Sequence, residues 1–311
     1  MTQKPLKKLA AIFALITFAS CSNSTETLTE STPETTSDSV VADLPVIAVT
    51  YSILGDLVSQ LVGDNATVNV VIPDGQDPHE FQPSAKDIEI INNSALVISN
   101  GLEFEEGLKE VLENIADSGG NIFMVGDHIT VRKIEDGDES EHAHGGSDPH
   151  IWLSPATMLE MLPALTTALS EATGANLSAE AKALTTELQS LDGEVESIIS
   201  SLGECNLVSG HDEMGYFADR YGCKVIGAII PSFTTTSEGT AGELAELKEL
   251  VTKYKVPAIF TGLGVSPDTA TQLAKELGIK AVTLSTHYLD GSANYQEFIL
   301  KMTNQIAEAL G

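Results

Sequence analysis

The stretch Gly145-Gly146-Ser147-Asp148-Pro149-His150-Ile151-Trp152-Leu153-Ser154-Pro155 organises the chain around one histidine and one helix start. His150 follows a rigid Asp-Pro step. Ser154 and Pro155 are residue types that favour the N-cap and the first position of a helix, so a helix is predicted from Pro155 onward. The word Asp-Pro-His occurs a second time, at residues 77–79.

Four of the seven histidines share a pattern of placement. Three follow short apolar runs that indicate buried strands, and the fourth precedes the helix. Open α/β sheets bind ligands outside the carboxyl ends of their strands. Together the four predict one metal site, although each by itself is more simply a polar residue in a loop. They are His79 after residues 66–72, His150, His211 after residues 206–209, and His287 after residues 280–285.

Length, composition and charge bound the class of protein. The chain has 311 residues, 42% of them hydrophobic, which is enough for one large or two ordinary globular domains. The net charge of −29 argues against nucleic acid and against an anionic membrane surface as partners. An acidic surface attracts cations, but an exported protein that is merely soluble has the same charge.

Residues 1–20 have the pattern of an export signal, with three lysines before the apolar run 9–18. Phe18-Ala19-Ser20-Cys21 resembles a bacterial lipobox, in which Cys21 becomes lipidated; cleavage without lipid is the alternative, because Phe18 replaces the usual leucine. No later segment is apolar enough to span a membrane. Residues 21–43 are rich in Ser, Thr and Glu and predict a disordered tether. The mature protein is therefore expected outside the cytoplasm, tethered or soluble.

Strands alternate with helices on both sides of a long helical stretch. This order predicts an α/β fold whose two lobes each have a central parallel sheet flanked by helices. The predicted parts are an N-terminal lobe over 44–174, a linking helix over 175–203 and a C-terminal lobe over 204–311. The linking helix, roughly 37 Å long at about 1.5 Å per residue, is expected to join the lobes rigidly.

Some local features are predicted within this plan. Ser52 is expected to cap a helix, residues 104–115 to be helical, and His211 to begin a helix whose positive end keeps its imidazole neutral. Residues 135–148 form a hydrophilic loop with acidic residues and two further histidines, expected to be disordered and at most to gather cations weakly.

The three cysteines divide into one for lipid and one pair. Cys205 and Cys223 each stand directly before a strand-like run. If those strands are parallel neighbours, their starts lie side by side and a disulfide is geometrically reasonable in an oxidising compartment. The alternative is two buried thiols.

Three short sequence motifs resemble the signature motifs of the zinc/manganese solute-binding lipoproteins of ABC transporters. The resemblance covers about residues 45–310 and implies two α/β lobes joined by a rigid helix, with one metal between them. It implies the ligands His79, His150 and His211, and His287 as the fourth. Many relatives have aspartate at the fourth position, and Asp290 competes with His287 for that role. The motifs are Asp77–Pro83, Asp148–Pro155 and Gly210–Ala218.

Ligand chemistry favours zinc. Imidazole suits zinc, copper, nickel and iron, whereas manganese prefers more oxygen ligands, so Zn²⁺ is predicted and Mn²⁺ is the alternative. Four neutral imidazoles leave the charge of the ion uncompensated; Asp148, Asp212 or other acids are expected to orient them. Affinity is expected to fall as the pH falls through the histidine range.

The predicted function is an extracytoplasmic receptor that passes zinc to an ABC permease. ATP hydrolysis is assigned to a separate ATPase subunit, because the chain has no Walker-type loop. The receptor is expected to be a monomer that contacts the membrane only through its lipid. A zinc-dependent hydrolase is the rival class, but catalytic zinc usually keeps an open position, and no His-Glu-Xaa-Xaa-His helix is present. A metal-dependent adhesin is a further alternative.

Overall fold

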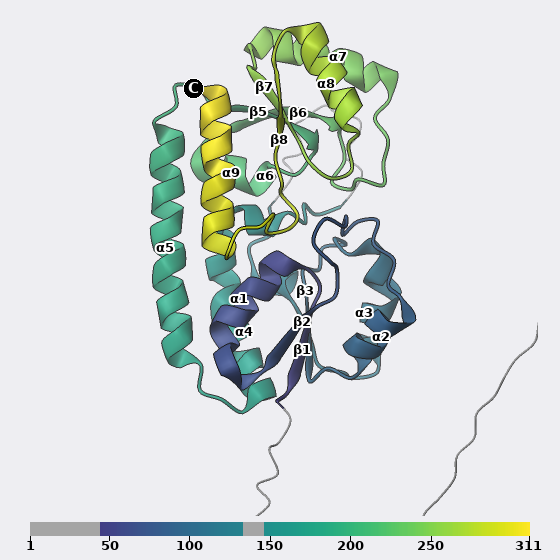
Figure 1. Ribbon diagram of the computed structural model, residues 1–311, viewed down its shortest axis with the longest axis vertical. Helices are drawn as coiled ribbons and strands as arrows, with labels where there is room; N and C mark the ends of the chain where they lie inside the picture. The colour runs from purple at the N-terminus through teal and green to yellow at the C-terminus, as the bar shows by residue number, and fades with distance from the viewer. Residues whose placement is uncertain (1–43, 133–145) are drawn as a thin grey trace, which may run out of the picture. The chain divides into compact units, whose positions relative to one another are not determined.

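The computed structural model describes residues 44–132 and 146–311, which form one compact unit (Figure 1). The predicted signal and tether, Cys21, and residues 135–145 of the acidic loop lie outside the described residues. Within the described ranges, no helix combines the length and the apolar character needed to cross a membrane.

The first half of the described chain forms a four-stranded parallel sheet with the strand order β2-β1-β3-β4. Strand β3 is buried at every position, which explains its continuous apolar sequence. The strands are β1 Val46–Val49, β2 Thr67–Val70, β3 Leu96–Ser99 and β4 Ile122–Met124, with α1 Ser52–Val62, α2 Ala85–Asn92 and α3 Lys109–Asp117 and the 3-10 turns η1 Gly63–Asn65, η2 Glu106–Leu108 and η3 Val125–His128.

The C-terminal lobe, which is the last third of the chain, has the same arrangement of strands and helices. Its sheet is also fully parallel, and its strand order β6-β5-β7-β8 is equivalent to that of the first sheet. The carboxyl ends of the strands therefore form a corresponding edge in each half. The strands are β5 Asn206–His211, β6 Lys224–Ile230, β7 Ala258–Thr261 and β8 Lys280–Thr283, with α6 Gly215–Tyr221, α7 Ala241–Tyr254 and α8 Pro267–Leu277.

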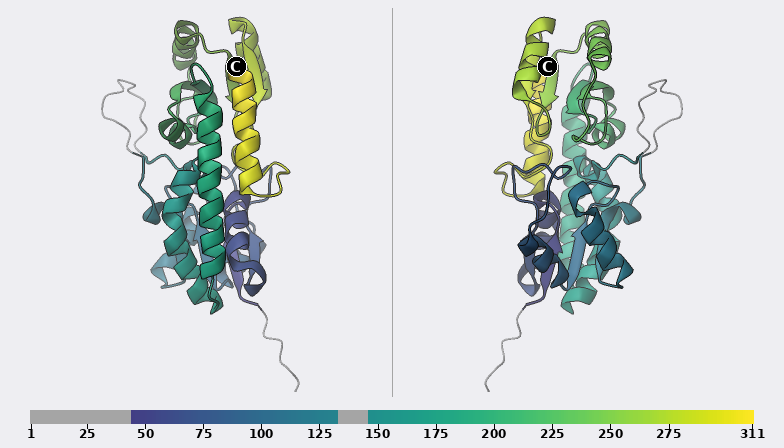
Figure 2. Two further views of the ribbon diagram at one scale, coloured as in Figure 1. Left: turned by 90° about the vertical axis from the view of Figure 1, so that its left-hand side faces the viewer. Right: turned by 90° about the vertical axis from the view of Figure 1, so that its right-hand side faces the viewer.

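Helix α5, Ser178–Ser200, joins the two halves (Figure 2). It contacts α1 and α4 (Pro155–Thr173) on the first half, and α6 and α9 (Tyr295–Leu310) on the second. Its buried residues recur every three to four positions, as one face of a helix requires; they are Leu184, Leu188, Leu191, Val195 and Ile199. The prediction of two parallel α/β lobes joined by one long helix is confirmed.

Helix α9 also connects the halves, because its first residue contacts two elements of the N-terminal lobe. The backbone N–H of Tyr295 donates to Asp56 Oδ2 at 2.8 Å, and its hydroxyl donates to the carbonyl of Trp152 at 2.8 Å. A single hydrophobic cluster accordingly contains buried residues of both lobes, including Trp152, Leu207 and Phe260. The sequence pattern did not reveal this shared core.

Two predicted helix starts are wrong in detail. Ser52 is the first residue of α1 instead of its cap, and its hydroxyl accepts the N–H of Leu289 from the other half at 3.3 Å. The helix predicted over 104–115 begins only as η2 at Glu106, because the backbone of Glu105, with φ −92° and ψ 68°, is not helical.

The cysteine pair lies at the starts of two neighbouring strands. Asn206 of β5 pairs with Lys224 of β6, so the residues directly before them are adjacent. The structure joins Cys205 and Cys223 by a disulfide.

We expect loss of this disulfide to lower the stability of the C-terminal lobe. The bond spans a sequence separation of 18 residues, and closing a loop of that size typically stabilises a protein by about 3 kcal/mol. The double variant Cys205→Ser/Cys223→Ser should lose about that much in the free energy of unfolding, measured by chemical denaturation without metal. Reduction of the wild-type protein should give the same loss; an unchanged midpoint in both would contradict the prediction.

Candidate metal centre

The two Asp-Pro-His motifs have the same local conformation, because in each the aspartate accepts a hydrogen bond from the backbone N–H of the histidine. His79 N–H donates to Asp77 Oδ1, and His150 N–H donates to Asp148 Oδ1, both at 3.0 Å. Such a turn, in which a side chain bonds the backbone two residues on, fixes the direction of the residue that follows the proline. The repeated motif therefore places two imidazoles in a defined orientation.

The other two histidines come from the second sheet. His211 is the last residue of β5, and His287 lies in the segment after β8. Helix α6 begins only at Gly215, with Met214 at its N-cap position, so the prediction that His211 begins a helix is wrong. Residues 212–214 connect the strand to the helix, and the neutrality of His211 has another cause.

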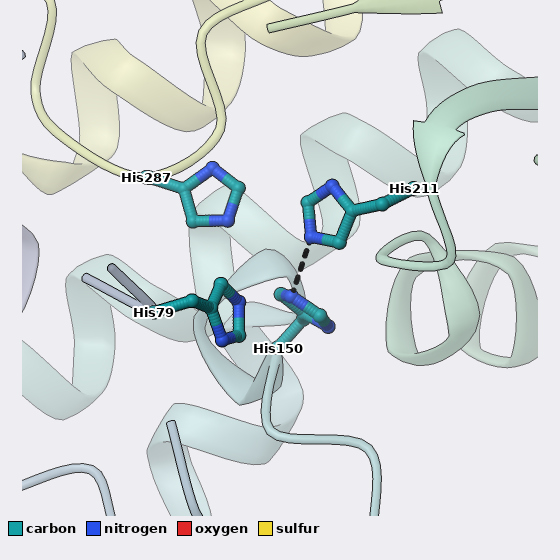
Figure 3. Close-up of side chains that lie close together, drawn as sticks. All are labelled: His79, His150, His211 and His287. Atoms are coloured by element: carbon teal, nitrogen blue, oxygen red, sulfur yellow. Dashed lines mark hydrogen bonds between the residues drawn. The ribbon is translucent and has the colours of Figure 1, made fainter. Parts of the chain in front are cut away.

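The four predicted histidines converge (Figure 3). Their candidate ligand atoms all lie within 4.8 Å of one another, and each side chain is buried, at most 2% exposed. Asp290, the competitor for the fourth position, lies elsewhere, with its carboxylate 2.6 Å from Lys301 Nζ.

The inward-facing nitrogens have the arrangement that a metal ion needs. Nε2 of His150 and Nε2 of His211 are 3.1 Å apart, whereas both ring nitrogens of His79 and Nε2 of His287 are buried without a hydrogen-bond partner. Buried polar atoms are rarely left unpaired in proteins. Four nitrogens around a tetrahedral zinc ion at about 2.0 Å would be about 3.3 Å apart. The four rings therefore fit one ion after small adjustments.

Carboxylates lie behind the rings. Asp148 Oδ1 is 2.9 Å from Nδ1 of His150, as expected from the sequence, and Glu106 Oε1 is 3.6 Å from Nδ1 of His79. The contact between Asp148 and His150 is short enough for a hydrogen bond and selects the tautomer of His150 whose Nε2 carries the lone pair.

Glu213 is the acid that the sequence analysis missed. Its Oε1 lies 3.9 Å from Nδ1 of His211, and its Oε2 lies 3.8 Å from Nδ1 of His287. The Thr286 hydroxyl, 3.0 Å from that Nδ1, donates to Glu213 Oε2 at 2.6 Å. Glu213 could have been predicted from its spacing. It lies two residues from His211, and Asp148 lies two residues from His150, although on the other side.

Burial sets the charge states of the site. It lowers the pKa of His150, His211 and His287 well below the ordinary value, with help from the neighbouring histidines. Burial also raises the pKa of Asp148 to about 7 and that of Glu213 to about 8. These three histidines therefore stay neutral at a pH below the usual range of histidine, and protons compete with the metal mainly at the two carboxyl groups.

We expect zinc binding at pH 7 to release between about one and two protons. At this pH Glu213, with a pKa of about 8, is mostly protonated, and Asp148, with a pKa of about 7, is about half protonated. A divalent ion at the imidazoles lowers both pKa values, so protons leave and apparent affinity rises with pH until about pH 8. Calorimetry in buffers of different ionisation enthalpy measures the release. No release at pH 7 would contradict this account.

Aromatic rings surround the cluster, and hydrogen bonds near it join the two lobes at two places. The ring of Trp152 lies 4.6 Å from that of Phe104, and Trp152 Nε1–H donates to Thr286 O at 2.6 Å. Glu106 accepts hydrogen bonds from Thr234 and Thr236 of the second half.

Arg132 provides a further link between the lobes. Its Nε donates to Asp219 Oδ2 of α6 at 2.7 Å, and its Nη1 lies 3.6 Å from Asp148 Oδ2. Gly215 leaves room for this pair, because a Cβ there would lie 2.4 Å from Asp148 Oδ2.

Comparison with known proteins assigns the chain to one family. Residues 47–309 match the ZnuA family, described as zinc-uptake complex component A, periplasmic, and the chain belongs to that family. Its members are metal-binding transport receptors and not enzymes, so the hydrolase alternative falls.

Individual relatives differ in the metal for which they are named. Manganese-binding lipoprotein MntA of Halalkalibacterium halodurans is 26% identical over 238 residues, covering 75% of this chain and 76% of its own. Iron-binding protein YfeA of Yersinia pestis is 25% identical, covering 88% and 85%. Zinc-binding protein AdcA of Streptococcus pyogenes is 28% identical over 77% of this chain, which spans half of AdcA.

Solved structures share the fold. The periplasmic zinc-binding protein TroA from Treponema pallidum superposes with a TM-score of 0.77 at 22% identity, covering 86% of this chain and 99% of TroA. A structure of ZnuA gives a TM-score of 0.74 at 23% identity, covering 86% and 100%.

Proposed function

We propose that this protein is an extracytoplasmic receptor that binds one zinc ion through His79, His150, His211 and His287 and delivers it to an ABC permease. The observation that carries the proposal is the convergence of four buried imidazoles whose candidate ligand atoms lie within 4.8 Å of one another. Family membership supports transport as the purpose of binding.

The donor set supports zinc over manganese. All four candidate ligands are nitrogens, and manganese sites usually contain more oxygen. The contacts of Asp148, Glu106 and Glu213 with the Nδ1 atoms resemble the outer partners that zinc-bound histidines commonly have. Manganese remains the alternative cargo, in keeping with the name of the relative MntA.

The export signal and the lipobox-like word before Cys21 support a lipid anchor outside the cytoplasmic membrane. An anchored receptor stays near its permease, and hydrolysis of ATP is left to the ATPase subunit of that transporter. Mass spectrometry of the protein purified from membranes tests this part, because lipidation at Cys21 changes the mass of the N-terminal peptide.

A competition titration tests the choice of metal. Purified protein, stripped of metal, is titrated with Zn²⁺ and with Mn²⁺ against a chromophoric chelator, and the metal content of protein isolated without chelators is measured. Tight binding of one zinc per chain with weaker manganese binding is expected. Preference for manganese would overturn the metal assignment alone, and failure to bind any divalent metal would overturn the receptor proposal.

A further inference from the structure

The four candidate ligands bring no charge of their own. An imidazole that binds a metal through a nitrogen lone pair is neutral, and all four rings are buried, so a divalent ion among them would carry its double charge into a water-poor site. An uncompensated charge in such a place is costly. Tight binding therefore requires negative charge close behind the rings.

Among the described residues, three carboxylates lie within 3.9 Å of an Nδ1 atom of the cluster, and two of these are already neutralised or shared. Asp148 is fully buried, but Arg132 Nη1 lies 3.6 Å from its Oδ2, so the guanidinium offsets its charge. The side chain of Glu106 is 35% exposed, and its oxygens also accept hydrogen bonds from Thr234 and Thr236. Water and these partners weaken its effect on an ion.

Glu213 differs from both. Its side chain is 4% exposed, and it faces two candidate ligands, with oxygens 3.9 Å from Nδ1 of His211 and 3.8 Å from Nδ1 of His287. Over residues 44–132 and 146–311, its ion-pair partners are these two histidines and include no lysine or arginine. A buried carboxylate without a permanent cation is expensive to keep. A bound metal ion is the cation that completes this arrangement.

We propose that Glu213 supplies the negative charge that allows four neutral imidazoles to hold a divalent ion, and thereby sets the preference of the site for divalent over monovalent metals. The proposal rests on the proposed receptor function and assigns selectivity to a residue that does not touch the ion. The Thr286 hydroxyl transmits the same charge to His287, because it donates to Glu213 and accepts from the imidazole. A monovalent ion carries half the charge and should therefore depend on Glu213 less.

The test compares Glu213→Gln with the wild-type protein for Zn²⁺ and for Ag⁺, a monovalent ion that imidazole also binds, in chloride-free buffer. Glutamine keeps the shape and the acceptor for Thr286 but removes the charge. We expect zinc affinity to fall by about 10- to 100-fold, the usual cost of losing an outer partner, and Ag⁺ affinity to fall by a smaller factor, because the charge–charge energy is proportional to the charge of the ion. The matched control is Glu105→Gln, since Glu105 is equally buried but bonds Thr50 and Asn100 instead of a histidine.

The possible outcomes distinguish a failure of the charge role of Glu213 from a failure of the proposed receptor function. Unchanged zinc affinity in Glu213→Gln, or an equal loss for Zn²⁺ and Ag⁺, would overturn the charge role while leaving the receptor intact. Failure of the wild-type protein itself to bind zinc would overturn the proposed function. If the glutamine variant does not fold, Glu213→Asp and Glu213→Asn provide the same comparison of charged and neutral side chains. The aspartate variant is then expected to bind zinc more tightly than the asparagine variant, and equal affinities would overturn the proposal.

Discussion

Replacing His150 with alanine should lower the affinity for zinc by more than about 100-fold, because a ligand must contribute more than the ten- to hundredfold that an outer partner contributes. Its Nε2 lies 3.1 Å from Nε2 of His211. Removal of the ring also leaves the buried carboxyl group of Asp148 without its imidazole partner. Competition titration of metal-free protein measures the change, and circular dichroism checks the fold.

His128→Ala is the matched control for this variant. His128 stacks on the ring of Phe123 at 4.4 Å and is not part of the four-histidine cluster, so its loss should leave zinc affinity unchanged. Equal losses in the two variants would indicate a general effect on folding. Retention of wild-type affinity in His150→Ala would show that the ion is held elsewhere.

The second large effect is expected from His287→Asp, which should shift the metal preference toward manganese. Aspartate adds an oxygen donor and a negative charge to a site that otherwise has four nitrogens, and manganese favours such mixed sites more than zinc does. The ratio of zinc affinity to manganese affinity should fall by about tenfold or more, equivalent to about 1.4 kcal/mol. Parallel titrations of the variant with both ions measure this ratio.

Asp290→Ala distinguishes the two candidates for the fourth position. Asp290 is bound to Lys301 at 2.6 Å and is 41% exposed, so its loss should change neither affinity nor preference. A large loss of zinc affinity in Asp290→Ala, with little change in His287→Asp, would reverse the assignment of the fourth ligand.

The sequence predicted the parts of the site that follow from local pattern. His79 and His211 were found because each follows or ends an apolar strand, and parallel strands bring their carboxyl ends to one edge. The position of His150 was predicted from the Asp-Pro step, and the structure adds the hydrogen bond from the backbone of His150 to Asp148. The alternation of strands and helices sufficed for the fold because it is repeated in both halves.

The features that were missed depend on contacts between distant segments. Glu213 belongs to the site because it contacts Thr286 and His287, and Thr286 is 73 positions further along the chain. Ser52 has the residue type of a helix cap, but its hydroxyl accepts an N–H from the other lobe. Helix α9 has an ordinary amphipathic pattern, and nothing in that pattern indicates that Tyr295 bonds Asp56. The secondary-structure propensity of a residue gives no information about such tertiary contacts.

The hydrophobic cluster shared by both lobes has a consequence for how the molecule melts. Trp152 and Tyr295 belong to one cluster that both lobes build, and each lobe adds a smaller cluster of its own, so the loss of either lobe would expose buried apolar residues of the other. We expect calorimetry to record a single cooperative transition in the absence of metal. Zinc should then move the entire transition to higher temperature, since a ligand of the native state stabilises everything that unfolds with its site.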